Sequence, residues 1–251
     1  MTPISIQLYS LREQAQKNFI EVIKKVADIG YRGVEPAGLF GHPPGEVRKI
    51  VADLGMTVSS NHQPWPNRDN LSEVADVAAE LGTSIVTCGF GSDHFVDLET
   101  IKKTADTANF IVDRLTSKGL VVVLHNHHWE FDRIDGRIKY DIFMELCPDM
   151  QCEIDVYWAA NFGEVDPVDI VKRYSGKAPL LHLKDGTLRK EDLQKPLGAG
   201  KLDIKSVIAA ADPSVLQWLI VELDTSDRDM IQSVRESYDY LIDNGLAKGN
   251  K

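Results

Sequence analysis

The amino-acid sequence predicts a closed (β/α)₈ barrel, and three observations lead to this fold class. The chain has 251 residues, 43% of them hydrophobic, which is enough for a large core and fits either two ordinary domains or one α/β barrel. A unit made of an amphipathic helix, a glycine and a short β-branched run repeats along the chain. The β-rich runs recur at spacings of roughly 25–40 residues, the length of strand–helix units joined by right-handed crossovers. Eight such units in about 250 residues are typical of this barrel.

The repeating unit is clearest around four glycines, Gly30, Gly55, Gly82 and Gly119. Each follows a segment with apolar residues at helical spacing and precedes a run rich in β-branched residues. We therefore expect each of them to end a helix at positive φ.

The elements follow from these patterns. Strands are expected at 4–8, 33–35, 57–60, 85–88, 121–125, 151–155, 180–184 and 219–223, with helices between them that include 140–146, 167–174, 203–210 and 230–241. The alternative is an open doubly wound sheet. The sequence has no G-x-G-x-x-G after the first strand and no phosphate-binding P-loop, so a nucleotide fold has no support. No linker divides the chain, and residues 1–251 are expected to form a single domain.

The composition of the chain limits which partners and which cellular compartment are expected. The formal net charge of −10 repels a long polyanion and predicts no nucleic-acid partner. The three cysteines have no C-x-x-C spacing and are expected to be reduced thiols. No signal peptide and no apolar run of the ~20 residues that span a bilayer are visible, so a cytoplasmic protein with no membrane contact is expected. A homo-oligomer is possible, and no sequence feature decides it.

Histidines gather where such a barrel carries its active site, at the carboxyl ends of strands. All seven lie at an expected strand end or in the loop that follows it: His42, His62, His94, His125, His127, His128 and His182. Trp65, Trp129 and Trp158 fall in the same class of position. Their flat faces suit the apolar face of a sugar ring, and the alternative is loop packing.

Carboxylates share these strand ends and predict a metal site. Alternation puts Glu153 with Asp155, His182 with Lys184, and Glu222 with Asp224 on one face of each strand. Converging buried carboxylates repel one another, and a divalent cation would neutralise them. The predicted ligands are Glu130, Asp155, His182 and Glu222, and the ion is Mn²⁺, Co²⁺, Zn²⁺ or Mg²⁺. The alternative is that Asp155 and Glu222 are salt-bridged to Lys184 or an arginine and that His182 is a satisfied core histidine.

Six short motifs resemble the sugar phosphate isomerase/epimerase family of the xylose isomerase-like TIM-barrel superfamily. They are Tyr31-x-x-Val-Glu35, His125-Asn-His-x-Trp-Glu130-Phe, Glu153-Ile-Asp155-Val-Tyr-Trp158, His182-Leu-Lys-Asp185, Leu197-Gly-Ala-Gly200-x-Leu-Asp203 and Val221-Glu222. The resemblance covers nearly the whole chain and implies one divalent metal on a Glu-Asp-His-Glu set from strands five to eight. Asp155, His182 and Glu222 match three of these ligands. The first glutamate of the ketose epimerases sits where this chain has Leu124 or His125, so Glu130, His125 or His127 is expected to take its place.

The resemblance implies a metal-dependent isomerase or epimerase that moves a proton next to the carbonyl of a keto-sugar through a metal-stabilised enediolate. Glu222 and Glu130 are the candidate proton carriers, with His127 and Lys184 as further candidates. The expected substrate contacts are Glu35, His62, His125, Trp129, Trp158 and Asp224. For Glu35 the alternative is a helix N-cap or an ion pair with Arg32.

Three other functions stay open on the sequence. A dehydratase or lyase of a 3-keto-glycoside or inosose would use the same enediolate for elimination. A DNA repair enzyme of the endonuclease IV type would need a basic face for DNA. The last is a sugar-binding barrel without catalytic activity.

Overall fold

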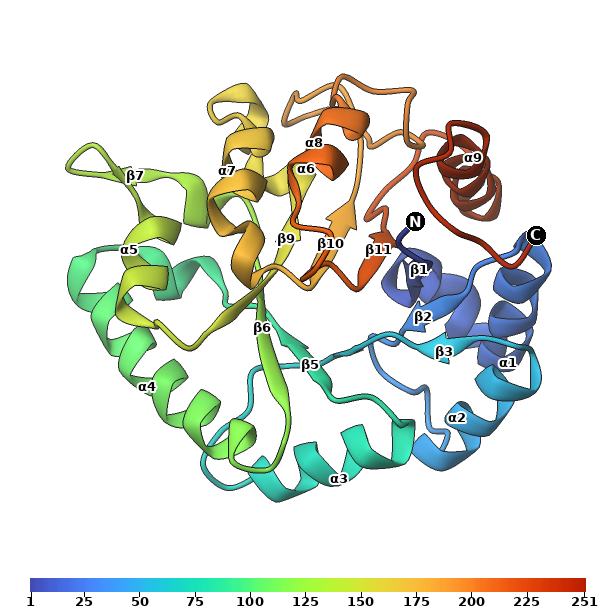
Figure 1. Ribbon diagram of the computed structural model, residues 1–251, viewed down its shortest axis with the longest axis horizontal. Coiled ribbons are helices and arrows are strands. Elements are labelled where there is room, and N and C mark those ends of the chain that lie inside the picture. The colour runs from blue at the N-terminus through green and yellow to red at the C-terminus, as the bar shows by residue number, and fades with distance from the viewer.

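The computed structural model describes residues 1–251 and forms a barrel of parallel strands surrounded by helices (Figure 1). The strands are ordered β3-β2-β1-β11-β10-β9-β6-β5-β4. Their bounds are β1 Ile4–Gln7, β2 Gly33–Glu35, β3 Thr57–Val58, β4 Asn61–His62, β5 Ile85–Cys88, β6 Val121–His125, β9 Gln151–Asp155, β10 Leu180–Leu183 and β11 Trp218–Val221. All eight predicted strands are present, in the predicted order.

The third predicted strand, 57–60, is formed only at β3, and a second short strand, β4, follows it after a break of two residues. β3 pairs with β2 and β4 pairs with β5, so this stretch of chain closes the barrel. Ser59 and Ser60 lie at the break. The Ser59 hydroxyl is 2.8 Å from the Ser5 hydroxyl, and the Ser60 hydroxyl donates to Glu35 inside the barrel. Side-chain hydrogen bonds thus hold the break in place.

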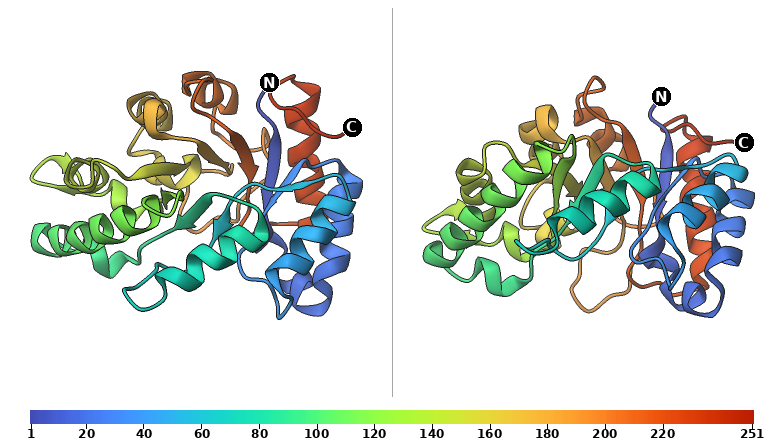
Figure 2. Two further views of the ribbon diagram at one scale, coloured as in Figure 1. Left: turned by 60° about the horizontal axis from the view of Figure 1, so that its bottom comes forward. Right: turned by 90° about the horizontal axis from the view of Figure 1, so that it is seen from below.

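Helices cover the outside of the strands (Figure 2). The longer ones are α1 Arg12–Ile29, α2 Pro44–Asp53, α3 Leu71–Leu81, α4 Leu98–Thr116, α5 Lys139–Leu146, α7 Pro167–Tyr174, α8 Ile204–Ala210 and α9 Met230–Asp243. The four-residue α6, Val156–Ala159, directly follows β9, and a small hairpin forms β7 Arg133–Ile134 and β8 Arg137–Ile138. All four predicted glycines have positive φ, but only Gly30 and Gly82 are the residues that cap a helix, with φ of +122° and +76°. Gly55 and Gly119 follow the caps Leu54 and Ser117.

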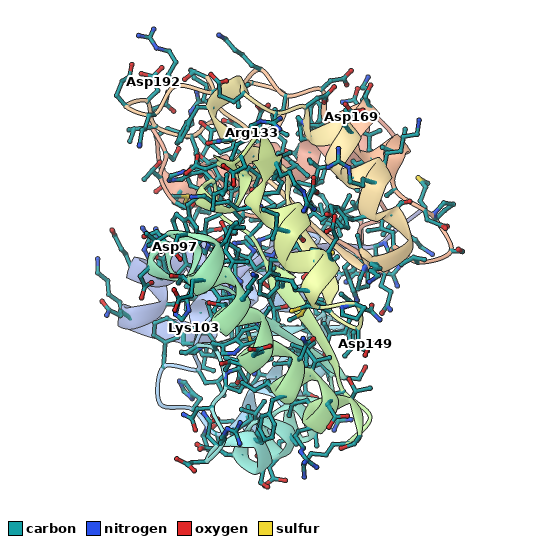
Figure 3. The ribbon with its side chains drawn as sticks, turned by 90° about the vertical axis from the view of Figure 1, so that its left-hand side faces the viewer. Asp97, Lys103, Arg133, Asp149, Asp169 and Asp192 are labelled. Atoms are coloured by element: carbon teal, nitrogen blue, oxygen red, sulfur yellow. The ribbon has the colours of Figure 1, made fainter.

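The outer surface is polar, and the chain ends lie together. Figure 3 views α4 and its neighbours, where exposed charged residues of both signs include Asp97, Lys103 and Arg133. Near the termini, the Ile4 amide donates to the Lys248 carbonyl at 3.1 Å. None of the helices combines the length and the apolar character that a membrane crossing requires.

Two apolar layers lie on opposite sides of the strands. The large cluster of 60 buried residues fills the space between strands and helices. A small separate cluster of Ile85, Val123, Leu180 and Ile220 fills the inside of the barrel. One step further along the strands, the inward positions become polar, with Thr87, His125, His182 and Glu222. The predicted alternation is therefore correct, and it places polar side chains at the carboxyl end of the barrel.

The loop between β10 and α8 is tied together by a buried carboxylate. Asp185 accepts hydrogen bonds from the backbone amides of Gly186, Gly198, Gly200 and Leu202 at 2.8–3.1 Å. A Cβ atom on Gly200 would lie 2.0 Å from Asp185 Oδ1 and 2.3 Å from the Gly186 nitrogen. Only glycine fits at this position without moving the loop.

We predict that Gly200→Ala lowers the free energy of unfolding by about 1–3 kcal/mol, because the added methyl group overpacks the loop against Asp185. Urea unfolding of the purified variant measures this loss. Gly176→Ala is the matched control, since a Cβ there meets no atom within 4 Å. Equal stabilities of the two variants would contradict this account of the loop.

Candidate functional site

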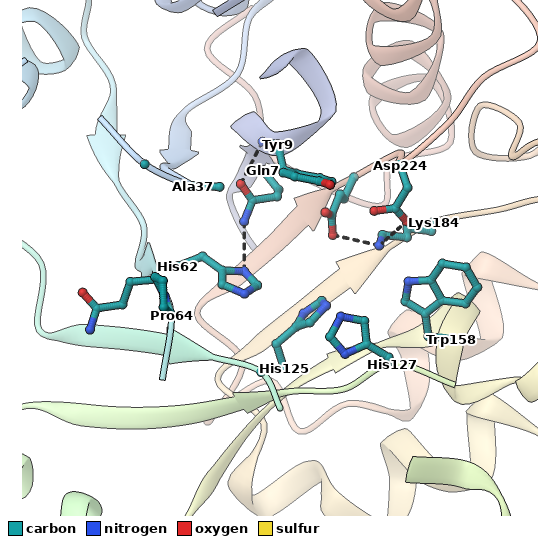
Figure 4. A pocket seen from close by; sticks show the side chains of 14 residues that line it. Gln7, Tyr9, Ala37, His62, Pro64, His125, His127, Trp158, Lys184 and Asp224 are labelled. Atoms are coloured by element: carbon teal, nitrogen blue, oxygen red, sulfur yellow. Dashed lines mark hydrogen bonds and ion pairs between the residues drawn. The ribbon is translucent and has the colours of Figure 1, made fainter. Parts of the chain in front are cut away.

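A cavity of about 660 Å³ opens at the carboxyl end of the barrel (Figure 4). In the figure, His62, His125 and His127 lie along one side, and Tyr9, Asp224 and Lys184 lie along the other. The lining residues come from strand ends and the loops after them: Gln7, Tyr9, Ala37, Gly38, His62, Gln63, Pro64, Gly89, His125, His127, Trp158, Lys184, Glu222 and Asp224. This is where a (β/α)₈ barrel carries its chemistry.

A buried group that could hold a metal lies at the floor of the cavity. His125, Asp155, His182 and Glu222 each offer one ligand atom, and these atoms lie within 4.8 Å of one another. They come from or directly follow four neighbouring strands, β6, β9, β10 and β11. Two overlapping groups, His62 with His125 and Glu153, and Glu35 with Glu153 and His182, lie next to it.

His182 is the central side chain of this cluster. Its Nδ1 is 2.7 Å from Glu222 Oε2, and its Nε2 is 3.0 Å from Glu35 Oε1 and 3.2 Å from Glu153 Oε2. Burial alone would lower the pKa of His182, but the carboxylates of Glu153, Glu35 and Glu222 outweigh burial and raise that pKa well above its usual value. In the absence of a metal the ring therefore carries a proton on each nitrogen.

Glu153 contacts both histidines of the metal-capable group. Its Oε2 is 3.1 Å from His125 Nδ1 and 3.2 Å from His182 Nε2, while its Oε1 accepts from the Thr87 hydroxyl at 3.3 Å. Burial, together with the nearby Glu35, raises the pKa of Glu153 well above its usual value. Burial also lowers the pKa of His125, which keeps that ring neutral and leaves it one nitrogen able to accept or to bind a metal.

Glu35 lies beneath the cavity and does not line it. Its carboxylate contacts the Gln7 amide at 2.5 Å, the Ser60 hydroxyl and His182, and it lies 3.4 Å from His62 Nδ1. These partners differ from the helix N-terminus or Arg32 that the sequence left open. Burial would raise the pKa of Glu35, but His182 and His62 outweigh it and keep the carboxylate ionised.

Lys184 is the buried cation of the site, with 1% of its side chain exposed. Its Nζ lies 2.9 Å from Asp155 Oδ2, 3.0 Å from Glu222 Oε2 and 2.8 Å from Asp224 Oδ2. Burial would lower the pKa of Lys184, and these carboxylates raise it well above its usual value instead. The salt bridges named above as the alternative to a metal are therefore present.

Those salt bridges supply too little positive charge and too few hydrogen bonds for the three carboxylates. One ammonium faces Asp155, Glu222 and Asp224, and only Asp224 receives an aligned hydrogen bond from it. Asp155 Oδ1 caps α6 by accepting from the Tyr157 and Trp158 amides at 3.0 and 2.9 Å. Asp155 Oδ2 is buried and has no hydrogen-bond partner, because its 2.9 Å approach to Lys184 is not aligned for one. An orphaned buried oxygen inside a His/Asp/Glu group fits the donor set of a bound cation.

Glu130 is not brought together with Asp155, His182 and Glu222, and it does not line the cavity. Its Oε2 accepts from the His127 amide at 3.0 Å, so the carboxylate folds back onto its own loop. Its Oε1 lies 3.8 Å from His127 Nδ1, and neither atom has a hydrogen-bond partner. The geometry groups His125, one of the alternatives that the sequence leaves open, with Asp155, His182 and Glu222, and it does not group Glu130 with them.

The other predicted residues divide between the cavity and its surroundings. His62, His125, His127, Trp158, Lys184, Glu222 and Asp224 line the cavity, and Asp155 and His182 lie at its floor. Trp129 does not line it and stacks on His127, with ring centroids 4.2 Å apart. The sequence reasoning missed Gln7 and Tyr9 as lining residues and Glu153 as the partner of both histidines. Alternation along β1 and β9 is the signal that finds Gln7 and Glu153.

Comparisons with known proteins agree with this architecture. Residues 23–244 match the family described as xylose isomerase-like TIM barrel. A sugar phosphate isomerase/epimerase from Parabacteroides distasonis superimposes with a TM-score of 0.81 at 23% identity, covering 98% of this chain and 96% of its own. The IOLI protein with a bound zinc atom superimposes with a TM-score of 0.76 at 14% identity, covering 96% and 97%. A probable endonuclease 4 from Mycobacterium tuberculosis is 25% identical over 193 residues, 73% of this chain and 75% of its own.

We predict that Lys184→Met destabilises the chelator-treated protein by about 3–5 kcal/mol, because it leaves buried carboxylates without their cation. The pKa of Lys184 is raised, so its contribution is fully present at all pH values below the usual lysine value and is lost only as the pH rises above it. Urea unfolding at neutral pH measures the loss. Lys49→Met, which breaks the exposed ion pair with Asp53, is the control and is expected to have little effect. A Lys184 variant as stable as this control would show that Lys184 does not neutralise the cluster.

Proposed function

The chain belongs to the xylose isomerase-like TIM-barrel family, and on that basis we propose that it is a metal-dependent sugar isomerase or epimerase. The observation that carries the proposal is the group of His125, Asp155, His182 and Glu222 at the floor of a polar cavity, directly beside the Lys184 ammonium. A metal site and a fixed positive charge in one cavity suit a reaction that develops negative charge on a sugar oxygen.

His125, Asp155, His182 and Glu222 are the proposed ligands of one divalent cation. Two imidazoles and two carboxylates favour Zn²⁺, Mn²⁺ or Co²⁺ over Mg²⁺, which prefers oxygen ligands alone. When bound, such an ion supplies a Lewis acid that polarises a carbonyl group. Glu153, which faces a nitrogen of both histidines, would fix their ring orientation in the manner of outer carboxylates at metal sites.

Proton transfer is assigned to side chains that line the cavity. His127 reaches it from the loop after β6, with Trp129 stacked on its ring and Glu130 behind it. Glu222 reaches it from the end of β11. The salt bridge to Lys184 and the contact with His182 overcome burial and lower the pKa of Glu222 to about 2, which suits a ligand better than a base. His127 is therefore the leading proton carrier, Lys184 would hold the developing oxyanion, and Glu130 would act through His127.

The rest of the cavity suits a polyol. Gln7, His62, Gln63 and Asp224 offer hydrogen-bonding groups for sugar hydroxyls, and Trp158 offers an aromatic face. Glu35 supports this wall from below through Gln7 and His62 rather than by contacting the sugar. A small-molecule carbohydrate is thus the proposed substrate.

Two rival functions have a specific basis. A dehydratase or lyase would begin with the same proton abstraction and then expel a neighbouring group. An endonuclease is favoured by the similarity to endonuclease 4, but the acidic lining of Glu222 and Asp224 suits a polyanion poorly. We expect no incision of DNA that contains abasic sites.

Deuterium exchange tests the proposed reaction. We predict that the metal-loaded protein, incubated with keto-sugars in D₂O, introduces deuterium at the carbon next to the carbonyl without any other mass change. Mass spectrometry and NMR of the recovered sugar measure the exchange, and His182→Ala is the control that should abolish it. Loss of water or of an aglycone would identify a lyase, and a sugar bound without exchange would point to a binding protein.

Metal affinity tests the ligand set. We predict that His125→Ala strongly weakens metal binding, whereas Glu130→Gln retains one metal per chain with little loss of affinity. Glu153→Gln should weaken binding by roughly 10–100-fold while the stoichiometry stays the same, because an outer partner is weakened rather than a ligand removed. Competition with a chromophoric chelator measures all three. The opposite order for His125 and Glu130 would restore Glu130 as the ligand.

A further inference from the structure

We propose that the substrate of this site is an uncharged sugar that carries no phosphate group. The inference rests on the proposed function and specifies its substrate class. It follows from how the chain uses its cations, its loop amides and its helix N-termini around the cavity.

The cavity has no cation free for a phosphate. None of its 14 lining residues is an arginine, and Lys184 is its only lysine. The Lys184 ammonium lies within 3.0 Å of the carboxylates of Asp155, Glu222 and Asp224. A phosphate dianion entering the cavity would meet Glu222 and Asp224 directly and would have to compete with them for one ammonium.

Arg12 lies near the rim, and its guanidinium is already engaged. Its Nη1 donates to the Tyr9 carbonyl and its Nη2 to the Asp224 carbonyl, both at 2.9 Å. The Cζ atom stacks 4.2 Å from the centre of the Tyr9 ring. Arg12 thus positions Tyr9 and Asp224 and does not line the cavity.

The backbone amides that could bind a phosphate are occupied by the chain's own carboxylates. Barrels of this type often bind phosphate with the loops after strands seven and eight and a nearby helix N-terminus. Here Asp185 takes four amides of the loop after β10. Asp203 caps α8 through the Ser206 amide at 3.1 Å, and Asp229 caps α9 through the Gln232 amide at 2.9 Å. The chain's own carboxylates therefore already accept hydrogen bonds from these three groups of amides.

The overall balance of charge points the same way. Besides Glu153, which contacts two imidazole rings, four carboxylates lie in or under the cavity: Glu35, Asp155, Glu222 and Asp224. A divalent cation together with Lys184 would offset three of these four charges. The site keeps an acidic balance with its metal in place, and this balance opposes a substrate dianion while leaving neutral hydroxyls unaffected.

Paired substrates test this inference. Free ketopentoses and ketohexoses are compared with the same sugars phosphorylated at the terminal carbon, by kcat/KM for deuterium exchange with the metal-loaded protein. We expect a preference of at least about tenfold for the free sugar, since an unpaired charge near like charges costs that much or more. Equal or faster exchange of the phosphate esters would overturn the inference.

Asp224→Asn provides a matched electrostatic test. It removes one negative charge from the cavity wall and releases Lys184 from one partner, so the preference for the free sugar should shrink by roughly threefold or more. Asp227→Asn is the control on the same loop, where the carboxylate lies outside the cavity and pairs with Arg228 at 3.2 Å. An unchanged preference in Asp224→Asn would contradict the electrostatic origin.

Direct binding separates this inference from the proposed function. If no sugar of either kind exchanges, the proton-transfer proposal fails for these substrates, and calorimetry with inorganic phosphate and the phosphate esters decides the charge question alone. No detectable binding at millimolar concentrations supports an uncharged ligand. Binding of the esters that is tighter than that of the free sugars overturns it.

Discussion

The structure depends on one electrostatic constraint: several carboxylates are buried together at the carboxyl end of the barrel. Glu35, Glu153, Asp155 and Glu222 are at most 4% exposed, and they face one another across a narrow interior. Burying such groups costs several kcal/mol each unless protons, cations or hydrogen bonds compensate them. Two layers of side chains compensate these buried charges: hydrogen-bonding groups beneath the cavity, and Lys184 at its wall.

The deepest layer fixes the geometry of the layer above it. The hydroxyls of Thr87 and Ser60 donate to the carboxylates of Glu153 and Glu35, and these two carboxylates contact Nε2 of His182. Nδ1 of His182 then lies 2.7 Å from the Glu222 carboxylate. Because each side chain is restrained by the one beneath it, the ligand atoms at the cavity floor are preorganised for a cation. Asp155 completes this arrangement, because one of its oxygens caps α6 and the other faces Lys184 without an aligned hydrogen bond.

The outer layer connects this charge balance to function. Lys184 cannot neutralise three neighbouring carboxylates alone, which leaves a role for a second cation. That cation, when bound, would stabilise negative charge that develops on the substrate. The same acidic surplus, together with the loop amides that donate to Asp185, supports the proposed preference for a neutral polyol over a phosphate ester. The proposed metal requirement and the proposed charge of the substrate thus both rest on one distribution of carboxylates.

Much of this arrangement could be predicted from the sequence, because strand periodicity decides which side chains point inward. The pairs Leu180/His182 and Ile220/Glu222 lie on the inner face as predicted, and Asp155 and His182 meet as predicted. The side-chain directions in the loop after β6 could not be predicted in this way, because the alternation of inward and outward side chains stops at the end of the strand. Glu130 folds back on the His127 amide through a local hydrogen bond that periodicity does not encode. The role of Asp185 likewise depends on amides up to 17 positions along the chain, which only the folded loop brings together.

Crystals of the protein soaked with Mn²⁺ and measured at the manganese absorption edge test the central claim most directly. We predict one strong anomalous peak among His125, Asp155, His182 and Glu222, with Glu153 hydrogen-bonded to both imidazole rings. A crystal without any peak, with Lys184 alone between the carboxylates, would contradict a metal-dependent site. A peak beside Glu130 and His127 would contradict the assigned ligands.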